Sequence, residues 1–184
     1  MQNRKTQGIK INLIKKTVMK KLIISLSLIL ITGFAFSQSP LYRGSSLLNL
    51  GVGLSDSGIP VYIGFDHSVS QDITLGAELS YRAYNENWQN DYYNHNIIGI
   101  SGNANYHFNN LFRISPRWDL YAGANVGFYI WTSPDGYTGS HNSGLGLGGQ
   151  IGGRYFFTNN LAINLEFGGG NAFNGGKLGL SFRL

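Results

Sequence analysis

The chain ends with Lys177-Leu178-Gly179-Leu180-Ser181-Phe182-Arg183-Leu184, in which apolar residues alternate with glycine, serine and basic residues. Successive side chains of a β-strand point to opposite faces, so this alternation predicts a strand with one apolar and one polar face. Seven segments upstream repeat the pattern, with the ionisable residues on the face that carries glycine and asparagine. The eight segments are 46–54, 60–69, 73–84, 97–108, 118–131, 145–157, 161–169 and 177–184. They predict an all-β fold, an eight-stranded antiparallel up-and-down transmembrane β-barrel.

The residues before Gln38 have the features of a secretory signal. Met19-Lys20-Lys21 is basic, 22–36 is apolar, and Ala35-Phe36-Ser37 supplies the small residues that precede a cleavage site. The apolar run is shorter than the roughly 20 residues that a membrane-spanning helix needs. We therefore expect a signal peptide at 19–37, cleaved after Ser37, and a barrel domain at 38–184. Residues 1–18 are expected to be a mis-assigned start or an extended basic leader.

Charge separates this leader from the predicted barrel. The whole chain carries a formal net charge of +5, but seven of its 14 Lys and Arg precede Ser37 while all nine Asp and Glu follow it. The expected mature chain is therefore 7 − 9 = −2, and no basic patch remains to bind nucleic acid. The absence of Cys excludes disulfides, thiolate metal sites and a lipid-modified amino-terminal cysteine.

The connections between the segments differ in length from one end of the barrel to the other. Outer-membrane barrels have short periplasmic turns and longer extracellular loops. The turns 70–72 and 158–160 are therefore expected in the periplasm, and the loops 85–96 and 132–144 outside the cell. The connection 109–117 is long for a periplasmic turn, and its apolar residues predict that it folds back against the rim.

Register can be predicted for the hairpin around Thr158-Asn159-Asn160. Side chains of one face must stay on that face across a strand pair, which requires an odd-length loop here. Phe157 then lies opposite Leu161 and Arg154 opposite Asn164. Glu166 becomes the diagonal neighbour of Arg154, within reach of an ion pair.

The composition of the two faces favours a membrane barrel over a soluble barrel or sandwich. A soluble surface is about 25–35% charged, whereas the polar face here is mostly Gly, Asn, Ser and Thr. Its few charges balance, as expected for ion pairs inside a closed lumen. The expected lumen network is Asp66, Glu78, Arg82, Asp119, Arg154, Glu166, Lys177 and Arg183. Aromatic residues expected to form a girdle at the periplasmic interface are Tyr106, Phe108, Trp118, Tyr155, Phe157 and Phe182.

Three motifs resemble a known family, the small eight-stranded outer-membrane barrels of the OmpA/OmpX type, particularly the barrel-only proteins of the Bacteroidetes. The motifs are Tyr121-x-Gly123-x-x-x-Gly127, Gly153-Arg154-Tyr155-Phe156-Phe157-Thr158 leading to Glu166-x-Gly168, and the carboxyl-terminal Lys177-x-Gly179-x-x-Phe182-x-Leu184. The last is similar to the assembly signal of such barrels, although many relatives end in an aromatic residue instead of Leu184. The resemblance implies a Gram-negative outer-membrane location, contact with membrane lipid, and delivery by periplasmic chaperones to the barrel-assembly machinery.

One segment resembles an enzyme motif. His141 and Ser143 are similar to the His and Ser of outer-membrane lipid A deacylases, and parity points both toward lipid. A catalytic triad also needs an acid, and the outward positions of segment 161–169 carry none. The remaining histidines, His67, His95 and His107, lack metal-ligand spacing. We therefore expect no enzyme activity, metal or cofactor.

The loop 85–96 is the strongest candidate for binding. Its aromatic rings, amides and acids provide stacking surfaces and hydrogen bonds for a glycan or protein ligand. The candidate residues are Trp88, Asp91, Tyr92, Tyr93 and His95. The alternative is that these rings only form the outer aromatic girdle. The sequence thus predicts a non-enzymatic outer-membrane barrel with a structural or surface-interaction role, the alternatives being a lipid A-modifying enzyme and a small passive pore.

Overall fold

The computed structural model describes residues 41–88, 91–137, 139 and 142–184. The predicted signal peptide and the residues before it lie outside this part of the chain, so both stay predictions. Among the described residues, no helix is long and apolar enough to cross a membrane.

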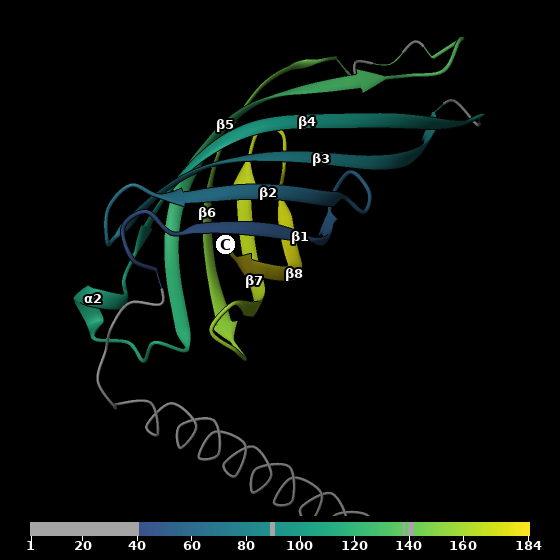
Figure 1. The fold of residues 1–184 in the computed structure, drawn as a ribbon. Helices are drawn as coiled ribbons and strands as arrows, with labels where there is room; N and C mark the ends of the chain where they lie inside the picture. Colours follow the sequence, from purple (N-terminus) through teal and green to yellow (C-terminus); the bar gives the residue numbers. More distant parts are fainter. Residues whose placement is uncertain (1–40, 89–90, 138, 140–141) are drawn as a thin grey trace, which may run out of the picture. The chain divides into compact units, whose positions relative to one another are not determined.

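Eight antiparallel strands form one closed barrel, in which each strand pairs with its neighbours in sequence and β1 pairs with β8 (Figure 1). The strands are β1 (Ser46–Ser55), β2 (Val61–Ser68), β3 (Ile73–Trp88), β4 (Asp91–His107), β5 (Trp118–Thr132), β6 (Gly144–Phe156), β7 (Leu161–Gly170) and β8 (Gly175–Arg183), with the short helix α2 (Asn109–Phe112) between β4 and β5. The closed up-and-down barrel confirms the predicted fold.

The predicted register of the β6–β7 hairpin is also confirmed. Arg154 lies opposite Asn164, and the Phe157 N–H donates to the Leu161 carbonyl at 2.9 Å. The connections 69–72, 108–117 and 157–160 share one end of the barrel, called here the short-turn end. The other end, the long-loop end, carries 56–60, 133–143, 171–174 and the tip of β3 and β4.

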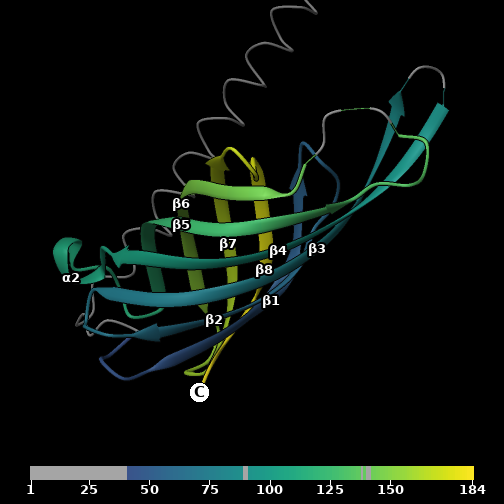
Figure 2. The same ribbon diagram turned by 90° about the horizontal axis from the view of Figure 1, so that it is seen from above.

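The predicted loop at 85–96 is wrong, because β3 continues to Trp88 and β4 begins at Asp91. Pairing runs out to Trp88 and Asp91, past the last pair of β3 with β2 at Tyr81. We call the outer part, 83–88 and 91–96, the β3–β4 ribbon. At roughly 3.3 Å per residue it extends about 20 Å beyond β2, and Figure 2 shows these strands running past the others. The polar sequence does not predict these strands, because outside the membrane neither face of the ribbon has to be apolar.

Burial is inverted relative to a soluble protein. The apolar side chains of the strands point outward, with Leu165 47% and Phe167 56% exposed, while Asp119 and Ser181 are fully buried and Arg154 is 2% exposed. Polar side chains therefore fill the interior and an apolar surface surrounds it, which suits hydrocarbon outside. A soluble barrel would have the faces the other way round.

Glycines on the inner face make room for the larger inward side chains. A Cβ at Gly152 would overlap the Tyr121 ring, and one at Gly76 would overlap the Asp66 carboxylate. Eight strands enclose little more space than their own side chains fill, so each bulky inward residue requires a small one nearby.

The connection between β4 and β5 folds against the rim at the short-turn end, as its apolar residues predicted. The Asn109 side chain accepts a hydrogen bond from the Leu120 N–H at 3.1 Å, which ties α2 to β5. Phe108 lies with its ring centroid 5.2 Å from Tyr106 and 5.7 Å from Phe112. With the pair Trp118 and Tyr155 at 4.8 Å, these rings form an aromatic band around this end.

Candidate functional site

The half of the lumen nearer the short-turn end is held by a cluster around Arg154. The guanidinium donates to Asp66 at 2.7 Å and to Asp119 at 2.9 Å, and it lies 4.4 Å from the centroid of the Tyr121 ring. All three charged groups are almost fully buried. The expected pair of Arg154 with Glu166 is not formed, because the guanidinium is held by Asp119, directly opposite on the neighbouring strand β5, and by Asp66, which reaches it across the lumen from β2.

His107 extends this Arg154 cluster. Its Nδ1 lies 2.6 Å from the Asp119 carboxylate and its Nε2 lies 3.0 Å from the Thr74 hydroxyl. This order of hydroxyl, imidazole and carboxylate resembles a nucleophile, base and acid. However, Thr74 and His107 are 1% exposed and Asp119 is fully buried, so no substrate can reach the hydroxyl. The chain of hydrogen bonds is structural.

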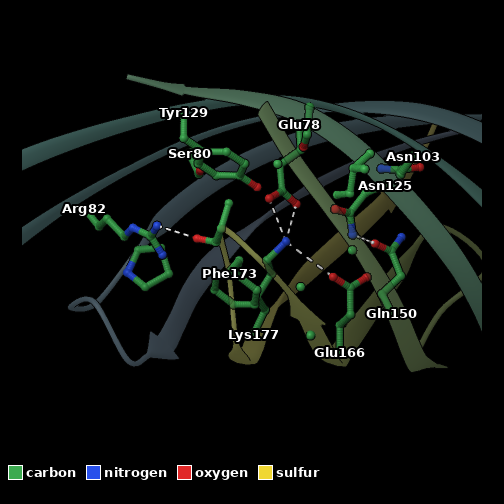
Figure 3. Close-up of a pocket in the computed structure, with 18 residues that line it drawn as sticks. Glu78, Ser80, Arg82, Asn103, Asn125, Tyr129, Gln150, Glu166, Phe173 and Lys177 are labelled. Carbon is green, nitrogen blue, oxygen red and sulfur yellow. Dashed lines mark hydrogen bonds and ion pairs between the residues drawn. The ribbon is translucent and has the colours of Figure 1, made fainter. Parts of the chain in front are cut away.

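A second cluster lies around Lys177, nearer the long-loop end (Figure 3). Its ammonium group lies 2.6 and 2.8 Å from the two carboxylate oxygens of Glu78 and 3.4 Å from Glu166. The Tyr121 hydroxyl donates to Glu166 at 2.9 Å and so links the two clusters. The spaces beside these clusters are only about 30 Å³ next to Lys177 and about 20 Å³ next to Arg154, which is room for one or two water molecules.

The other two expected network residues lie away from these clusters. Arg183 is at the short-turn end, where its guanidinium donates to the Asn159 carbonyl and lies 5.5 Å from the centroid of the Phe156 ring. Arg82 is on β3 toward the long-loop end, where it donates to the Ala172 carbonyl at 2.8 Å and to the Ser55 hydroxyl at 3.3 Å. Within the described part of the chain, Arg82 has no carboxylate in ion-pair contact.

A cavity of about 410 Å³ opens at the long-loop end next to Arg82, and we call it the mouth cavity. It adjoins the small space above Lys177, and the two share Arg82, Tyr129, Ala172 and Phe173. Its lining residues are Asp56, Ser57, Arg82, Tyr129, Trp131, Asn142, Gly144, Leu145, Asn171, Ala172, Phe173 and Asn174. Aromatic rings, amides and one acidic residue, Asp56, thus surround one buried cation, with which Asp56 forms no ion pair.

The candidate ligand residues of the β3–β4 ribbon divide into two groups. The backbones of Trp88, Asp91 and Tyr92 are in the strands, but their side chains lie outside the described residues. The other two are engaged with the β5–β6 connection. His95 is fully buried, with its Nδ1 2.9 Å from the Ser133 hydroxyl, and Tyr93 packs against Tyr137 with a centroid distance of 5.2 Å.

Tyr137 is the centre of this contact between ribbon and loop. Its ring centroid lies 4.5 Å from that of His95, and its hydroxyl donates to the Glu86 carboxylate at 2.8 Å. Partial burial, together with this hydrogen bond, raises the pKa of Tyr137 to about 12. The hydroxyl therefore stays protonated as the donor near neutral pH. His95 and Tyr93 therefore hold the ribbon against the β5–β6 connection.

The structure gives no support to an enzyme site at 141–143. The Ser143 hydroxyl accepts a hydrogen bond from the Trp131 N–H at 3.0 Å, and His141 lies outside the described residues. In the part of the chain that is described, no group of three or more His, Asp or Glu side chains is placed to hold a metal ion.

Several residues of the lumen were missed from the sequence. Tyr62, Thr74, His107 and Tyr121 all contribute to the lumen hydrogen-bond network. Strand parity already places them on the polar face, but they carry no formal charge. The sequence signal that identifies them is a neutral hydrogen-bonding side chain at an inward position of a predicted strand.

Comparison with known proteins shows the fold but no closer relationship. No protein-family model matches the chain, and no curated protein matches it. Among solved structures, OprG from Pseudomonas aeruginosa superposes with a TM-score of 0.64 at 8% identity, over 80% of this chain and 99% of OprG. The amino-terminal barrel of OprF from the same species gives 0.56 at 17% identity, over 78% and 100%.

A third solved structure is Ail of Yersinia pestis in complex with the heparin analogue sucrose octasulfate. It gives a TM-score of 0.51 at 16% identity, covering 77% of this chain and 99% of Ail. By their names, OprG is an outer-membrane protein, the OprF fragment is a β-barrel domain and Ail is an attachment protein, and each is matched over almost its whole length. The protein described here therefore has the fold of the small eight-stranded β-barrels of bacterial outer membranes.

Proposed function

We propose that this chain is a non-enzymatic integral protein of the bacterial outer membrane that binds a partner at the cell surface. The observation that carries the proposal is the combination of an apolar outer surface with a lumen filled by ion pairs. The first suits a membrane, and the second leaves no passage for solutes. What remains for function is the long-loop end, with the β3–β4 ribbon and the mouth cavity.

The orientation follows from the same comparison of ends. Barrels of this type place their short turns in the periplasm, so we propose that the ribbon and the connection 133–143 face outward. The β8 strand, with Lys177, Gly179, Phe182 and Leu184, is proposed as the segment read by the barrel-assembly machinery after periplasmic chaperones deliver the chain.

The charge of the segments that are proposed to face out of the cell limits the class of partner that they can bind. They contain four acids, Asp56, Glu86, Asp91 and Asp135, and no Lys or Arg in 55–60, 83–96, 132–144 or 171–174. A polysulfated polymer of the kind represented by the heparin analogue bound to Ail needs basic residues. We therefore propose a neutral or weakly charged glycan, or a protein, as the partner of the ribbon.

The test uses cells that display the full chain and cells that display a variant with residues 84–95 replaced by an Asn-Gly turn. Binding of both cell types to an array of glycans and to immobilised extracellular proteins is compared. A ligand retained by the full chain and lost by the variant supports the proposal. Equal binding by both cell types contradicts it.

The enzyme alternative is tested separately by mass spectrometry of lipid A from cells with and without the gene. Unchanged acylation is expected. A change that disappears in the Ser143→Ala variant would overturn the proposal in favour of a lipid-modifying enzyme.

A further inference from the structure

Arg82 differs from the other buried cations of the barrel in lacking a counter-ion. It is 4% exposed, yet within the described residues its hydrogen-bond partners are one carbonyl and one hydroxyl. Arg154 has two carboxylates and Lys177 also has two. A buried charge normally needs such a partner, because removing it from water is costly.

The nearest acid on the same face of β3 does not serve Arg82. Glu78 is four residues earlier, about 13 Å away along a strand at roughly 3.3 Å per residue. Both of its carboxylate oxygens are within 2.8 Å of the Lys177 ammonium group. A guanidinium has five N–H donors, and the two contacts of Arg82 leave donors for a further acceptor.

Arg82 lines the mouth cavity, whose volume of about 410 Å³ is in the range of small-molecule sites. Figure 3 shows Arg82 and Tyr129 on one side of the Lys177 cluster, with Phe173 between Arg82 and Lys177. The guanidinium lies 5.9 Å from the centroid of the Tyr129 ring, and both residues line the mouth cavity. Lys177 and Glu78 line the adjoining small space of about 30 Å³ and not the mouth cavity itself.

The remaining wall has the chemistry of a sugar site. Tyr129, Trp131 and Phe173 offer ring faces, on which the C–H groups of a sugar ring can pack. Asn142 and Asn174 offer amides that pair with hydroxyl groups. A planar guanidinium matches a carboxylate in a bidentate pair.

We propose that the mouth cavity binds a small sugar carrying a single carboxylate, with the carboxylate on Arg82 and the ring against the aromatic wall. This rests on the proposed surface function and names a second binding site distinct from the ribbon. One negative charge satisfies Arg82, whereas the acidic outward segments disfavour a ligand with many.

The proposal is tested by calorimetric titration of the full-length protein in nanodiscs with three probes: D-glucuronate, D-glucose and inorganic sulfate. Saturable binding of glucuronate is expected, at least tenfold tighter than that of glucose or sulfate. Glucose binding as tightly as glucuronate would overturn the role of Arg82. Sulfate binding as tightly would overturn the assignment of a sugar.

The variant Arg82→Gln keeps a donor for the Ala172 carbonyl but removes the charge, and it should weaken glucuronate at least tenfold. Arg113→Gln, at the short-turn end, should leave binding unchanged. In nuclear magnetic resonance spectra, glucuronate should shift the indole N–H signal of Trp131 and not that of Trp118. A shift of Trp118 alone, or no effect of Arg82→Gln, would overturn the proposal.

Unfolding experiments distinguish a structural role of Arg82 from a role in binding a ligand. If Arg82 served mainly to stabilise the barrel, Arg82→Gln would lower the midpoint of unfolding. If it is kept for a ligand, removing an uncompensated charge leaves the midpoint unchanged or raises it, and added glucuronate raises the midpoint of the unmodified protein only. If the unmodified protein did not bind glucuronate while the ribbon still captured a glycan, this inference would be refuted and the proposed function would stand.

Discussion

Arg154 forms two almost fully buried ion pairs, and its removal should be correspondingly costly. Arg154→Met leaves Asp66 and Asp119 buried without their cation, so the free energy of unfolding should fall by about 3–5 kcal/mol. Denaturant titration of the protein folded into lipid vesicles measures this loss. Arg117→Met, an exposed arginine of the short-turn end, is the matched control and should change stability by no more than about 0.5 kcal/mol. A stabilised Arg154→Met variant would show that the cluster is not dry.

Leu165 lies on the outer face of the barrel, and its substitution tests whether that face contacts lipid. It lies in the middle of β7, points outward and is 47% exposed. Leu165→Arg places a charge in hydrocarbon and should destabilise the folded protein by about 2–4 kcal/mol in vesicles. Asn160→Arg, at an exposed position of the turn that precedes β7, is the control with little expected effect. If both variants unfolded at the same denaturant concentration, the assignment of β7 to the membrane would be refuted.

At the level of elements, the β3–β4 ribbon should be dispensable for folding. Between Asn96 and the tip, the backbones of β3 and β4 pair with each other alone, because Asn96 is the outermost residue of β4 that pairs with β5. The variant with an Asn-Gly turn in place of 84–95 should therefore fold, since a two-residue turn of this type closes a hairpin well. Its free energy of unfolding should lie within about 1 kcal/mol of that of the full chain. Heat-modifiable migration in gels reports folding. A variant that stays unfolded would mean that the ribbon is part of the folding unit.

Strand prediction succeeded where the membrane imposes a pattern and failed where it does not. The bounds of β5 and β7 were predicted to within one residue, because hydrocarbon on one side demands strict alternation. The ribbon was missed, since its sequence Asn85-Glu86-Asn87 has no apolar face. Parity also placed Arg154 and Glu166 on one face, and strand register alone puts Asp119 opposite Arg154 and Glu166 opposite Lys177. The contacts of Arg154 with Asp66 and of Lys177 with Glu78 depend instead on how far apart the strands lie across the lumen. Local sequence does not encode that distance.

For the molecule as a whole, the filled lumen predicts a closed barrel. The spaces next to the two ion-pair clusters hold one or two waters each. In planar bilayers we therefore expect no stable conductance steps from the purified protein. Arg154→Met, if it folds, should remain closed because the Lys177 cluster still blocks the lumen. Regular ohmic steps from the unmodified protein would contradict this and favour the passive pore.

The two ends of the barrel differ in their protease sites, which allows a test of orientation. The connection 133–143 contains no Lys or Arg, whereas 108–117 contains Arg113 and Arg117. On intact cells, proteinase K should cut the long-loop end and trypsin should not cut the barrel. After the outer membrane is permeabilised, trypsin should cut at Arg113 or Arg117. Cleavage by trypsin on intact cells would invert the proposed orientation.

The strands differ greatly in length around the barrel, and this determines the direction from which the mouth cavity is entered. β4 has 17 residues, whereas β2 has eight and β8 has nine. The rim at the long-loop end is therefore oblique, high along β3 to β5 and low where β7 and β8 meet β1 and β2 (Figure 2). With the low side level with the membrane surface, the opening faces along that surface. We therefore expect a molecule carried on a neighbouring lipid to reach the cavity from this low side.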